Sequence, residues 1–280
     1  MHDEVRVWVD GRRLPPDAPA ISVLDHGVTV GDGAFETCKV VDGTAFALTR
    51  HARRLDRSLA GLGLPPADHG HIAGGMEQVL SGDPIRFGRL RYSVTGGAGP
   101  LGSDRLESPL TYIVTAAAQP KPPASVKVVV VPWTRNERSA TAGLKTTSYA
   151  DNVVALAYAA RRGASEAIFA NTRGELCEAT GSNVFVVRAG SILTPPLSSG
   201  CLAGITRELT LEWCRSAGMD VREEHLPLDA LTTSDEVFLT SSTKDVMAVH
   251  AVDDAAVTCG PTTAAAAQLF AQRAAETTDP

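Results

Sequence analysis

The sequence predicts an α+β protein built from two domains. Short β-branched runs separated by Asp-Gly turns fill the first 118 residues and are typical of strands joined by hairpins. Three prolines in residues 119–124 then indicate a stiff, extended connector. Strand-like and amphipathic helical runs alternate after it. We therefore expect a smaller N-terminal domain (1–118), a linker (119–124) and a larger C-terminal domain (125–280).

The composition is that of a globular protein and argues against several classes. The net charge of −6 offers no basic footprint for nucleic acid, and no apolar run reaches the length of about 18 residues that a membrane span needs. The acidic start Met1–Glu4 precedes no apolar signal-like segment, so we expect a cytoplasmic protein. The five cysteines form no Cys-x-x-Cys pair, which favours free thiols and no metal site.

The N-terminal half contains a series of expected strands and helices. Alternating apolar residues, Asp-Gly turns and helical spacing of leucines define them. We expect strands over 5–9, 34–41, 45–48, 86–94 and 110–118, one helix that begins at Thr49, and another over 72–80.

Polar residues on the strand over 34–41 indicate a lined cavity. Phe35, Thr37 and Lys39 share one face because side chains alternate along a strand. A ring, a hydroxyl and an amine on one face are unusual for a core strand, although a solvent-facing side is the alternative. Arg50, near the next helix start, is a candidate anion ligand or one of several surface arginines in that turn.

Lys145 lies just before an expected helix in the C-terminal half. A buried strand over 126–131 precedes it, and a helix over 149–162 follows, with Val153, Leu156 and Ala160 expected on its apolar face. A lysine at such a junction can be partly desolvated, which makes its amine a usable nucleophile or base. The alternative is a solvated surface lysine.

Two segments are candidate phosphate sites. The helix expected after Gly204 starts with Ile205 and Thr206, and helix starts offer N–H groups to anions. The strand that begins at Glu236 runs into four hydroxyl residues that include Ser241 and Ser242. The glycine-rich loop 96–102 lacks the Gly-x-Gly-x-x-Gly spacing, so a dinucleotide site is rejected.

The motifs, in their order and spacing, resemble the fold type IV family of pyridoxal 5′-phosphate (PLP) enzymes, and the resemblance covers nearly the whole chain. The family includes branched-chain and D-amino acid aminotransferases and 4-amino-4-deoxychorismate lyases. The matching segments are Gly31-Asp32-Gly33-Ala34-Phe35-Glu36-Thr37, Arg50-His51, Arg135-Asn136, Lys145, Glu178-x-x-x-x-Asn183-x-Phe185, Thr194-Pro195-Pro196, Gly204-Ile205-Thr206-Arg207 and Asp235-Glu236-Val237-Phe238. The resemblance implies a D-amino acid aminotransferase-like architecture and a homodimer with the active site at its interface.

The resemblance also implies a role for each matching residue. Lys145 would bind PLP covalently and move the Cα proton of the substrate. Glu178 would pair with the pyridinium nitrogen, and Tyr149 would bond to the phenolic oxygen. The implied phosphate ligands are Arg50, Gly204, Ile205, Thr206, Ser241 and Ser242. The implied substrate contacts are Phe35, Thr37, Lys39 and Arg91, with Arg135 and Arg138 as further candidates for the carboxylate.

Within the family, the sequence favours the lyase that converts 4-amino-4-deoxychorismate to 4-aminobenzoate and pyruvate for folate synthesis. Thr37 and Lys39 stand where the branched-chain pattern has glycine and arginine, and the Arg-x-His trap of D-amino acid aminotransferases is missing after Tyr92. The Gly-Asp-Gly-x-Phe-Glu-Thr motif and the glycine-rich loop are most similar to the lyases. The alternative is an aminotransferase for branched-chain or D-amino acids. A non-catalytic PLP-binding protein is disfavoured, because a binder needs neither Lys145 nor Glu178.

Overall fold

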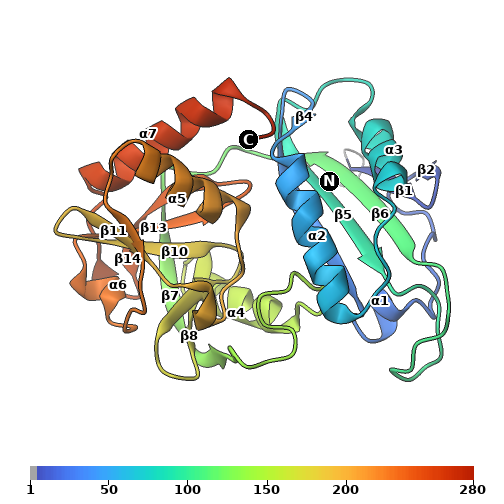
Figure 1. The fold of residues 1–280 in the computed structure, drawn as a ribbon, viewed down its shortest axis with the longest axis horizontal. Coiled ribbons are helices and arrows are strands. Elements are labelled where there is room, and N and C mark those ends of the chain that lie inside the picture. Colours follow the sequence, from blue (N-terminus) through green and yellow to red (C-terminus); the bar gives the residue numbers. More distant parts are fainter. Residues whose placement is uncertain (1–4) are drawn as a thin grey trace. The chain divides into compact units, whose positions relative to one another are not determined.

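The computed structural model describes residues 5–280, and it forms two compact units (Figure 1). The start Met1–Glu4, which contributed to the expectation of a cytoplasmic protein, lies outside the described residues. Of the described residues, the first unit contains 5–121, 144–149 and 278–280, and the second contains 122–143 and 150–277. Helices and sheets occur in both units, so the predicted α+β class is confirmed.

The two units differ from the predicted domains in two short segments. The chain passes from the first unit to the second after residue 121, which is inside the predicted linker. The segment 144–149, however, packs with the first unit. The cause is backbone pairing: Phe35 N donates to Lys145 O at 3.0 Å, and Thr147 N donates to Gly33 O at 2.8 Å. Residues 278–280 join the same unit, where Ala47 N donates to Thr278 O at 2.7 Å. Lys145 therefore belongs to the first unit.

The first unit is built on a six-stranded antiparallel sheet with the order β2-β1-β6-β5-β3-β4. Its strands are β1 (Arg6–Val9), β2 (Arg12–Leu14), β3 (Gly33–Val41), β4 (Thr44–Ala45), β5 (Phe87–Thr95) and β6 (Thr111–Ala118). Its helices are α1 (His26–Thr29), α2 (Leu48–Leu62) and α3 (His69–Leu80). The predicted Asp-Gly hairpins are confirmed: Asp10 and Asp42 adopt φ values of 44° and 47°, as such tight turns require.

One face of this sheet carries the core of the first unit. Helix α2 packs on β3, and α3 packs on β1 and β6 (Figure 1). Cys38 and Val40 of β3 join Leu55 of α2 in the same apolar cluster, which also contains Trp8 of β1. Because side chains alternate along a strand, Phe35, Thr37 and Lys39 of β3 share the opposite face, as predicted.

The second unit is built on a mixed nine-stranded sheet with the order β12-β11-β10-β13-β14-β7-β8-β9 and β15 paired to β14. Its strands are β7 (Ser125–Arg135), β8 (Glu166–Asn171), β9 (Leu176–Ala179), β10 (Asn183–Arg188), β11 (Ser191–Thr194), β12 (Val221–Glu223), β13 (Glu236–Ser241), β14 (Asp245–Val252) and β15 (Ala255–Ala256). Its helices are α4 (Ala150–Ala160), the 3₁₀ helix η1 (Leu197–Ser199), α5 (Ile205–Ser216), α6 (Ala230–Thr233) and α7 (Pro261–Glu276).

The buried face of α4 is not the predicted one. Asn152, Ala155 and Ala159 are buried, whereas Val153 and Leu156 are 64% and 45% exposed. The helix has apolar residues on both sides, and the small alanines face β7 and β8. The predicted apolar face of Val153, Leu156 and Ala160 was therefore wrong, and α4 presents large apolar side chains outward.

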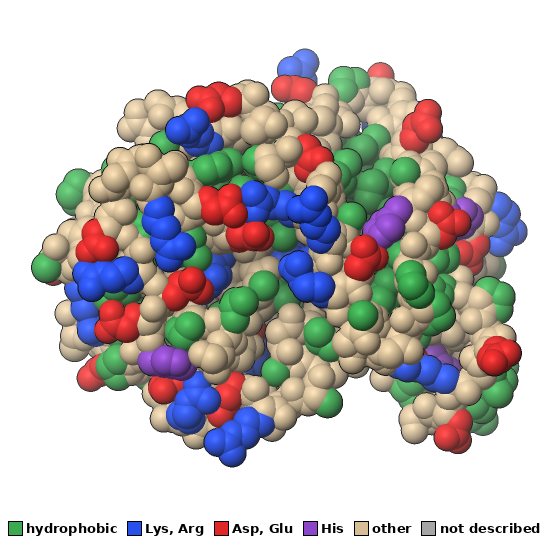
Figure 2. All heavy atoms as spheres, in the orientation of Figure 1, with side chains coloured by type: hydrophobic (Ala, Val, Ile, Leu, Met, Phe, Trp, Pro, Cys, Tyr) green, Lys and Arg blue, Asp and Glu red, His purple; other side chains and the backbone are tan. Residues whose placement is uncertain are grey.

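The surface is mixed in charge. Acidic and basic side chains are interspersed on the visible face (Figure 2). None of the helices within residues 5–280 is long and apolar enough to cross a membrane.

Candidate active site

Lys145 lies among aromatic rings in the first unit. Its Nζ is 4.4 Å from the centroid of the Phe35 ring and 5.8 Å from that of the Tyr149 ring. The two rings meet edge to face, with centroids 5.3 Å apart. The guanidinium carbon of Arg91 is 3.7 Å from the Phe35 ring centroid. The structure thus brings together four predicted site residues: the lysine, both rings and Arg91.

The backbone fixes the position of Lys145. Its N–H donates to the Ser58 hydroxyl of α2 at 3.1 Å, and its carbonyl accepts from Phe35 of β3 at 3.0 Å. The segment that follows is tied down as well, since the Thr147 hydroxyl donates to Gly31 O at 2.8 Å. The side chain therefore starts from a backbone that is held by both a helix and a strand.

The face of the sheet that carries Phe35 is rich in cations. Thr37 of β3 lies directly opposite Arg91 of β5, and Lys39 lies opposite Arg89. Directly opposed residues in an antiparallel pair point to the same face of a sheet. Arg89 is not among the predicted site residues, although its spacing of two residues from Arg91 on a predicted strand was a usable signal. Lys39, Arg89 and Arg91 form what we call the cationic face.

A buried ionic cluster lies on the other face of β3. The Glu36 carboxylate accepts from His51 Nδ1 at 2.6 Å and from Arg54 Nε and Nη2 at 2.8 and 2.7 Å. Burial raises the pKa of Glu36, but the charge and hydrogen bonds of Arg54, with those of His51, outweigh it and lower the pKa to about 2. Burial lowers the pKa of His51. The ionised Glu36 carboxylate therefore connects β3 to α2 on the face of the strand opposite Phe35.

Arg50 is in the first turn of α2, where the C-terminal residues also lie. Its Nε donates to Pro280 O at 2.9 Å. The Asp279 carboxylate caps the same helix by accepting from Thr49 N at 2.9 Å. Arg50 belongs to the first unit, whereas the other predicted phosphate ligands belong to the second.

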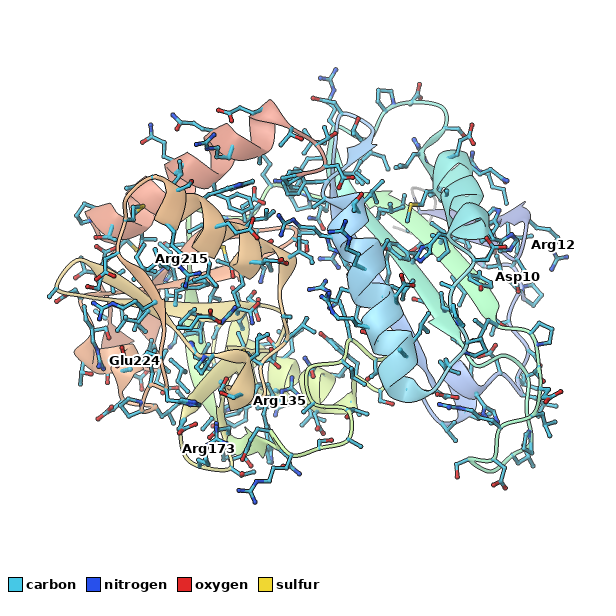
Figure 3. The ribbon with its side chains drawn as sticks, viewed as in Figure 1. Asp10, Arg12, Arg135, Arg173, Arg215 and Glu224 are labelled. Atoms are coloured by element: carbon cyan, nitrogen blue, oxygen red, sulfur yellow. The ribbon has the colours of Figure 1, made fainter. Side chains whose placement is uncertain are left out.

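Glu178 of β9 is held by a cation and a backbone N–H in the second unit. Its Oε1 is 3.3 Å from Arg135 Nε, and its Oε2 accepts from Leu202 N at 2.9 Å. Arg135 (labelled in Figure 3) ends β7 and stacks on Phe169, with its guanidinium carbon 4.2 Å from the ring centroid. The Arg135 Nη2 also donates to Asn152 Oδ1 at 2.7 Å. The carboxylate is thus oriented by its surroundings, as a partner for a ring nitrogen requires.

The start of α5 leaves its N–H groups available to an anion. Gly204 is the N-cap and has no side chain to cap the first turn, which begins with buried Ile205 and Thr206. Asn183 holds this turn through a bond from Nδ2 to Leu202 O at 2.8 Å. A Cβ on Gly204 would lie 2.0 Å from Asn183 Oδ1, so glycine is needed for this close approach.

The end of β13 lies beside this helix start and offers hydroxyls that lack partners. Asn183 of β10 is directly opposite Thr240 of β13. Within residues 5–280, the buried Thr240 Oγ1 and Ser241 Oγ have no hydrogen-bond partner, and Ser242 follows in the turn. An unpaired buried hydroxyl is costly. The helix start and the hydroxyl-bearing end of β13 are the candidate phosphate ligands in this unit, and we call them together the phosphate cradle.

No group of three or more His, Cys, Asp or Glu side chains in the described chain is arranged to hold a metal ion. All five cysteines are free thiols, four of them buried and Cys259 exposed.

A lysine amine, an oriented carboxylate and a phosphate cradle are the parts that a PLP-dependent enzyme needs.

Comparison with known proteins identifies the family. Residues 33–252 match the family model for amino-transferase class IV. The chain belongs to the class IV aminotransferase family, and it is therefore a PLP-dependent enzyme.

Curated relatives of three activities match almost the full chain. A putative branched-chain-amino-acid aminotransferase of Methanocaldococcus jannaschii is 30% identical and aligns over 89% of this chain and 88% of its own length. A D-alanine aminotransferase of Bacillus licheniformis is 30% identical over 91% of each chain. An aminodeoxychorismate lyase of Bacillus subtilis is 27% identical over 89% of this chain and 87% of its own.

Solved structures confirm the fold type IV architecture. A branched-chain aminotransferase from Thermoproteus uzoniensis, solved with norvaline, superposes with a TM-score of 0.88 at 26% identity over 95% of this chain and 93% of its own. A hypothetical aminotransferase from Mycobacterium tuberculosis, in its PLP-bound form, superposes with a TM-score of 0.83 at 28% identity. The match covers 98% of this chain and 100% of that structure's chain.

Proposed function

We propose that this enzyme is a lyase that converts 4-amino-4-deoxychorismate to 4-aminobenzoate and pyruvate. The observation that carries the proposal is the cationic face, with the Thr37 hydroxyl beside it on β3. The substrate has two carboxylates, one on the ring and one on the enolpyruvyl group, whereas a neutral amino acid has one. Three cationic side chains on one sheet face suit a dianion better than a monoanion.

Lys145 and Glu178 would divide the proton chemistry between them. PLP, when bound, supplies an electron sink for the carbon that carries the substrate amine. The Lys145 amine removes the proton from that carbon as a general base. The Glu178 carboxylate, 3.3 Å from Arg135 Nε, would keep a proton at the pyridine nitrogen. The cradle would hold the phosphate.

The bond changes balance without a second substrate. The carbon that bears the amine loses its proton to Lys145, and the neighbouring carbon–oxygen bond breaks with its electron pair on the ether oxygen. The ring becomes aromatic as 4-aminobenzoate, and the enolpyruvate takes up one proton at its methylene carbon to become pyruvate. We assign to the Thr37 hydroxyl a hydrogen bond to the departing oxygen, because it is on the same strand face as Phe35.

Transamination of branched-chain or D-amino acids is the competing function. Relatives with these activities are 30% identical to the chain, against 27% for the lyase, so overall identity does not separate the reactions. Both reactions begin with the same proton removal by Lys145. The distinction must come from the side chains that receive the substrate.

We also propose a homodimer. Support comes from large apolar side chains that are exposed in the single chain: Val23, Leu24 and Val28 near α1, and Trp133, Val153, Val154 and Leu156 in the second unit. Such side chains are costly to leave in water and are typical of an interface.

The test is a product assay on PLP-loaded protein with 4-amino-4-deoxychorismate and no keto-acid acceptor. We expect 4-aminobenzoate and pyruvate in equal amounts, and no activity and no lysine-linked visible absorption band in Lys145→Ala. Lys127→Ala, which removes a lysine paired with exposed Asp254, is the matched control and should behave as the native protein.

Two further variants connect activity to the sheet face. Arg89→Gln should raise KM for the dianionic substrate, and Thr37→Val should lower kcat by about 100-fold while proton removal from a simple amino acid persists. If no 4-aminobenzoate forms and D-alanine or leucine alone converts the cofactor to its amine form, the enzyme is an aminotransferase and the lyase proposal is wrong.

A further inference from the structure

A continuous chain of polar contacts joins Glu178 to the phosphate cradle inside the second unit. It starts at the ion pair between Glu178 and Arg135 and passes to Asn152. Asn152 Nδ2 then donates to the carbonyl of Thr180, in the loop between β9 and β10. The next member is Glu166 of β8, which accepts from Thr180 Oγ1 at 2.7 Å. Glu166 is therefore reached from the Glu178 carboxylate through four contacts.

Glu166 accepts hydrogen bonds from every residue of the loop 180–182 that follows β9. Its carboxylate accepts from Gly181 N at 2.8 Å and from Ser182 Oγ at 2.6 Å, in addition to Thr180. The side chain is 3% exposed. A buried carboxylate with three donors from three consecutive residues fixes both the position and the orientation of that loop.

The same carboxylate reaches the cradle through Lys244. Lys244 Nζ forms an ion pair with Glu166 Oε1. Lys244 stands in the turn after β13, and its N–H donates to Ser241 O at 3.2 Å. Burial raises the pKa of Glu166, but the charge of Lys244 and the hydroxyl bonds outweigh it and lower the pKa, so the Glu166 carboxylate is ionised near neutral pH.

We infer that Glu166 is a positioning residue that sets the Ser241–Ser242 turn relative to Glu178, and so fixes the distance between the two ends of the PLP site. It holds the phosphate-binding turn on one side and the loop next to the ring-nitrogen partner on the other. The inference depends on PLP binding by this family and holds for either the lyase or the aminotransferase reaction.

The phosphate group allows a test that separates misplacement of the cradle from a general loss of stability. PLP and pyridoxal share the ring and the aldehyde, but only PLP occupies a phosphate cradle. Titration of the cofactor-free protein with each compound, followed by the visible absorption band, gives two dissociation constants. In the native protein the ratio of these constants measures how well the cradle is placed.

We expect Glu166→Gln to weaken PLP binding by about tenfold, while pyridoxal binding changes less than about threefold. Lys244→Met should act in the same direction, because it releases the same turn. The double variant should be no worse than the stronger single one, since both act through one contact. Glu175→Gln is the control: its partly exposed carboxylate pairs with Arg173 outside this chain of contacts, and the PLP to pyridoxal ratio should be native.

Equal weakening of both compounds by Glu166→Gln would mean a general structural role and would overturn the inference. Unchanged binding of both compounds would overturn it as well. If Glu166→Gln does not fold, Ser182→Ala, which removes only one donor to the carboxylate, gives the same comparison with a smaller expected change in the ratio. The result does not depend on which substrate the enzyme uses, so it is separable from the lyase assay.

Discussion

Replacement of Glu36 by Gln should destabilise the first unit strongly, although Glu36 is not expected to touch substrate. The carboxylate is fully buried and is the shared partner of Arg54 and His51. Glutamine keeps the shape but leaves the Arg54 guanidinium buried without its counter-ion. Removing one partner of a buried pair costs about 3–5 kcal/mol.

The pKa gives an independent value for the same interaction. The pKa of Glu36 is lowered from 4.5 to about 2, because Arg54 and His51 outweigh the effect of burial. That difference corresponds to about 3 kcal/mol of folding free energy. Because the folded-state pKa is the lower one, this stabilisation is complete above pH 4.5 and is lost as the pH falls towards 2. Tyr92 and Cys38 stay neutral in this range, because burial raises the pKa of each.

The assay is urea unfolding followed by Trp8 fluorescence, in a background where Trp133 and Trp213 are replaced by Phe so that the signal reports the first unit. Trp8 is 1% exposed in the core of that unit. At pH 7 we expect Glu36→Gln to lower the free energy of unfolding by about 3–5 kcal/mol, and about 2 kcal/mol of the difference from the native protein should disappear at pH 3.

The matched control is Asp56→Asn. Asp56 is on α2 and pairs with His69 at 2.8 Å, but both side chains are nearly half exposed. Such pairs contribute about 0–1 kcal/mol. A loss below about 1 kcal/mol in Glu36→Gln, or a difference that stays constant down to pH 3, would refute the reasoning.

Two further predictions concern the cradle and the assembly. Gly204→Ala should weaken PLP binding by about tenfold or more, because its Cβ would lie 2.0 Å from Asn183 Oδ1, whereas Gly74→Ala, with nothing within 4 Å, should leave the PLP titration unchanged. The pair Val153→Glu and Leu156→Glu should convert a dimer to a monomer in analytical ultracentrifugation, because it places charge in exposed apolar positions of α4; Ala271→Glu on α7 is the control, and a native protein that sediments as a monomer would contradict the dimer.

The sequence was informative where local chemistry determines the backbone. The Asp-Gly hairpins formed as predicted, because positive φ values at Asp10 and Asp42 are a property of the turn itself. Alternation along β3 placed Phe35, Thr37 and Lys39 on one face for the same local reason. These predictions needed no knowledge of distant contacts.

The sequence was less informative where distant contacts decide. On α4, periodicity indicates the spacing of a buried face, but apolar residues on both sides of the helix allow either side to be buried. The side with the small residues Ala155 and Ala159 packs against the sheet. Residues 144–149 could not be assigned to the first unit, because their partners are on β3, more than 100 residues earlier. Glu166 gave no signal at all, since its donors come from the loop 180–182 and from Lys244.

The division of the site residues between the units offers a reason why relatives with different reactions share one fold. By our proposal the cradle and Glu178, both in the second unit, would serve the cofactor, which every member of the family needs. The cationic face, in the first unit, would serve the substrate, and its side chains stand on a sheet whose core is on the opposite face. Substitutions at Lys39 or Arg89 can therefore change the bound carboxylates without repacking a core. By this reasoning, changes on the cationic face alter the ratio between elimination and transamination, whereas changes at Glu166 lower both together.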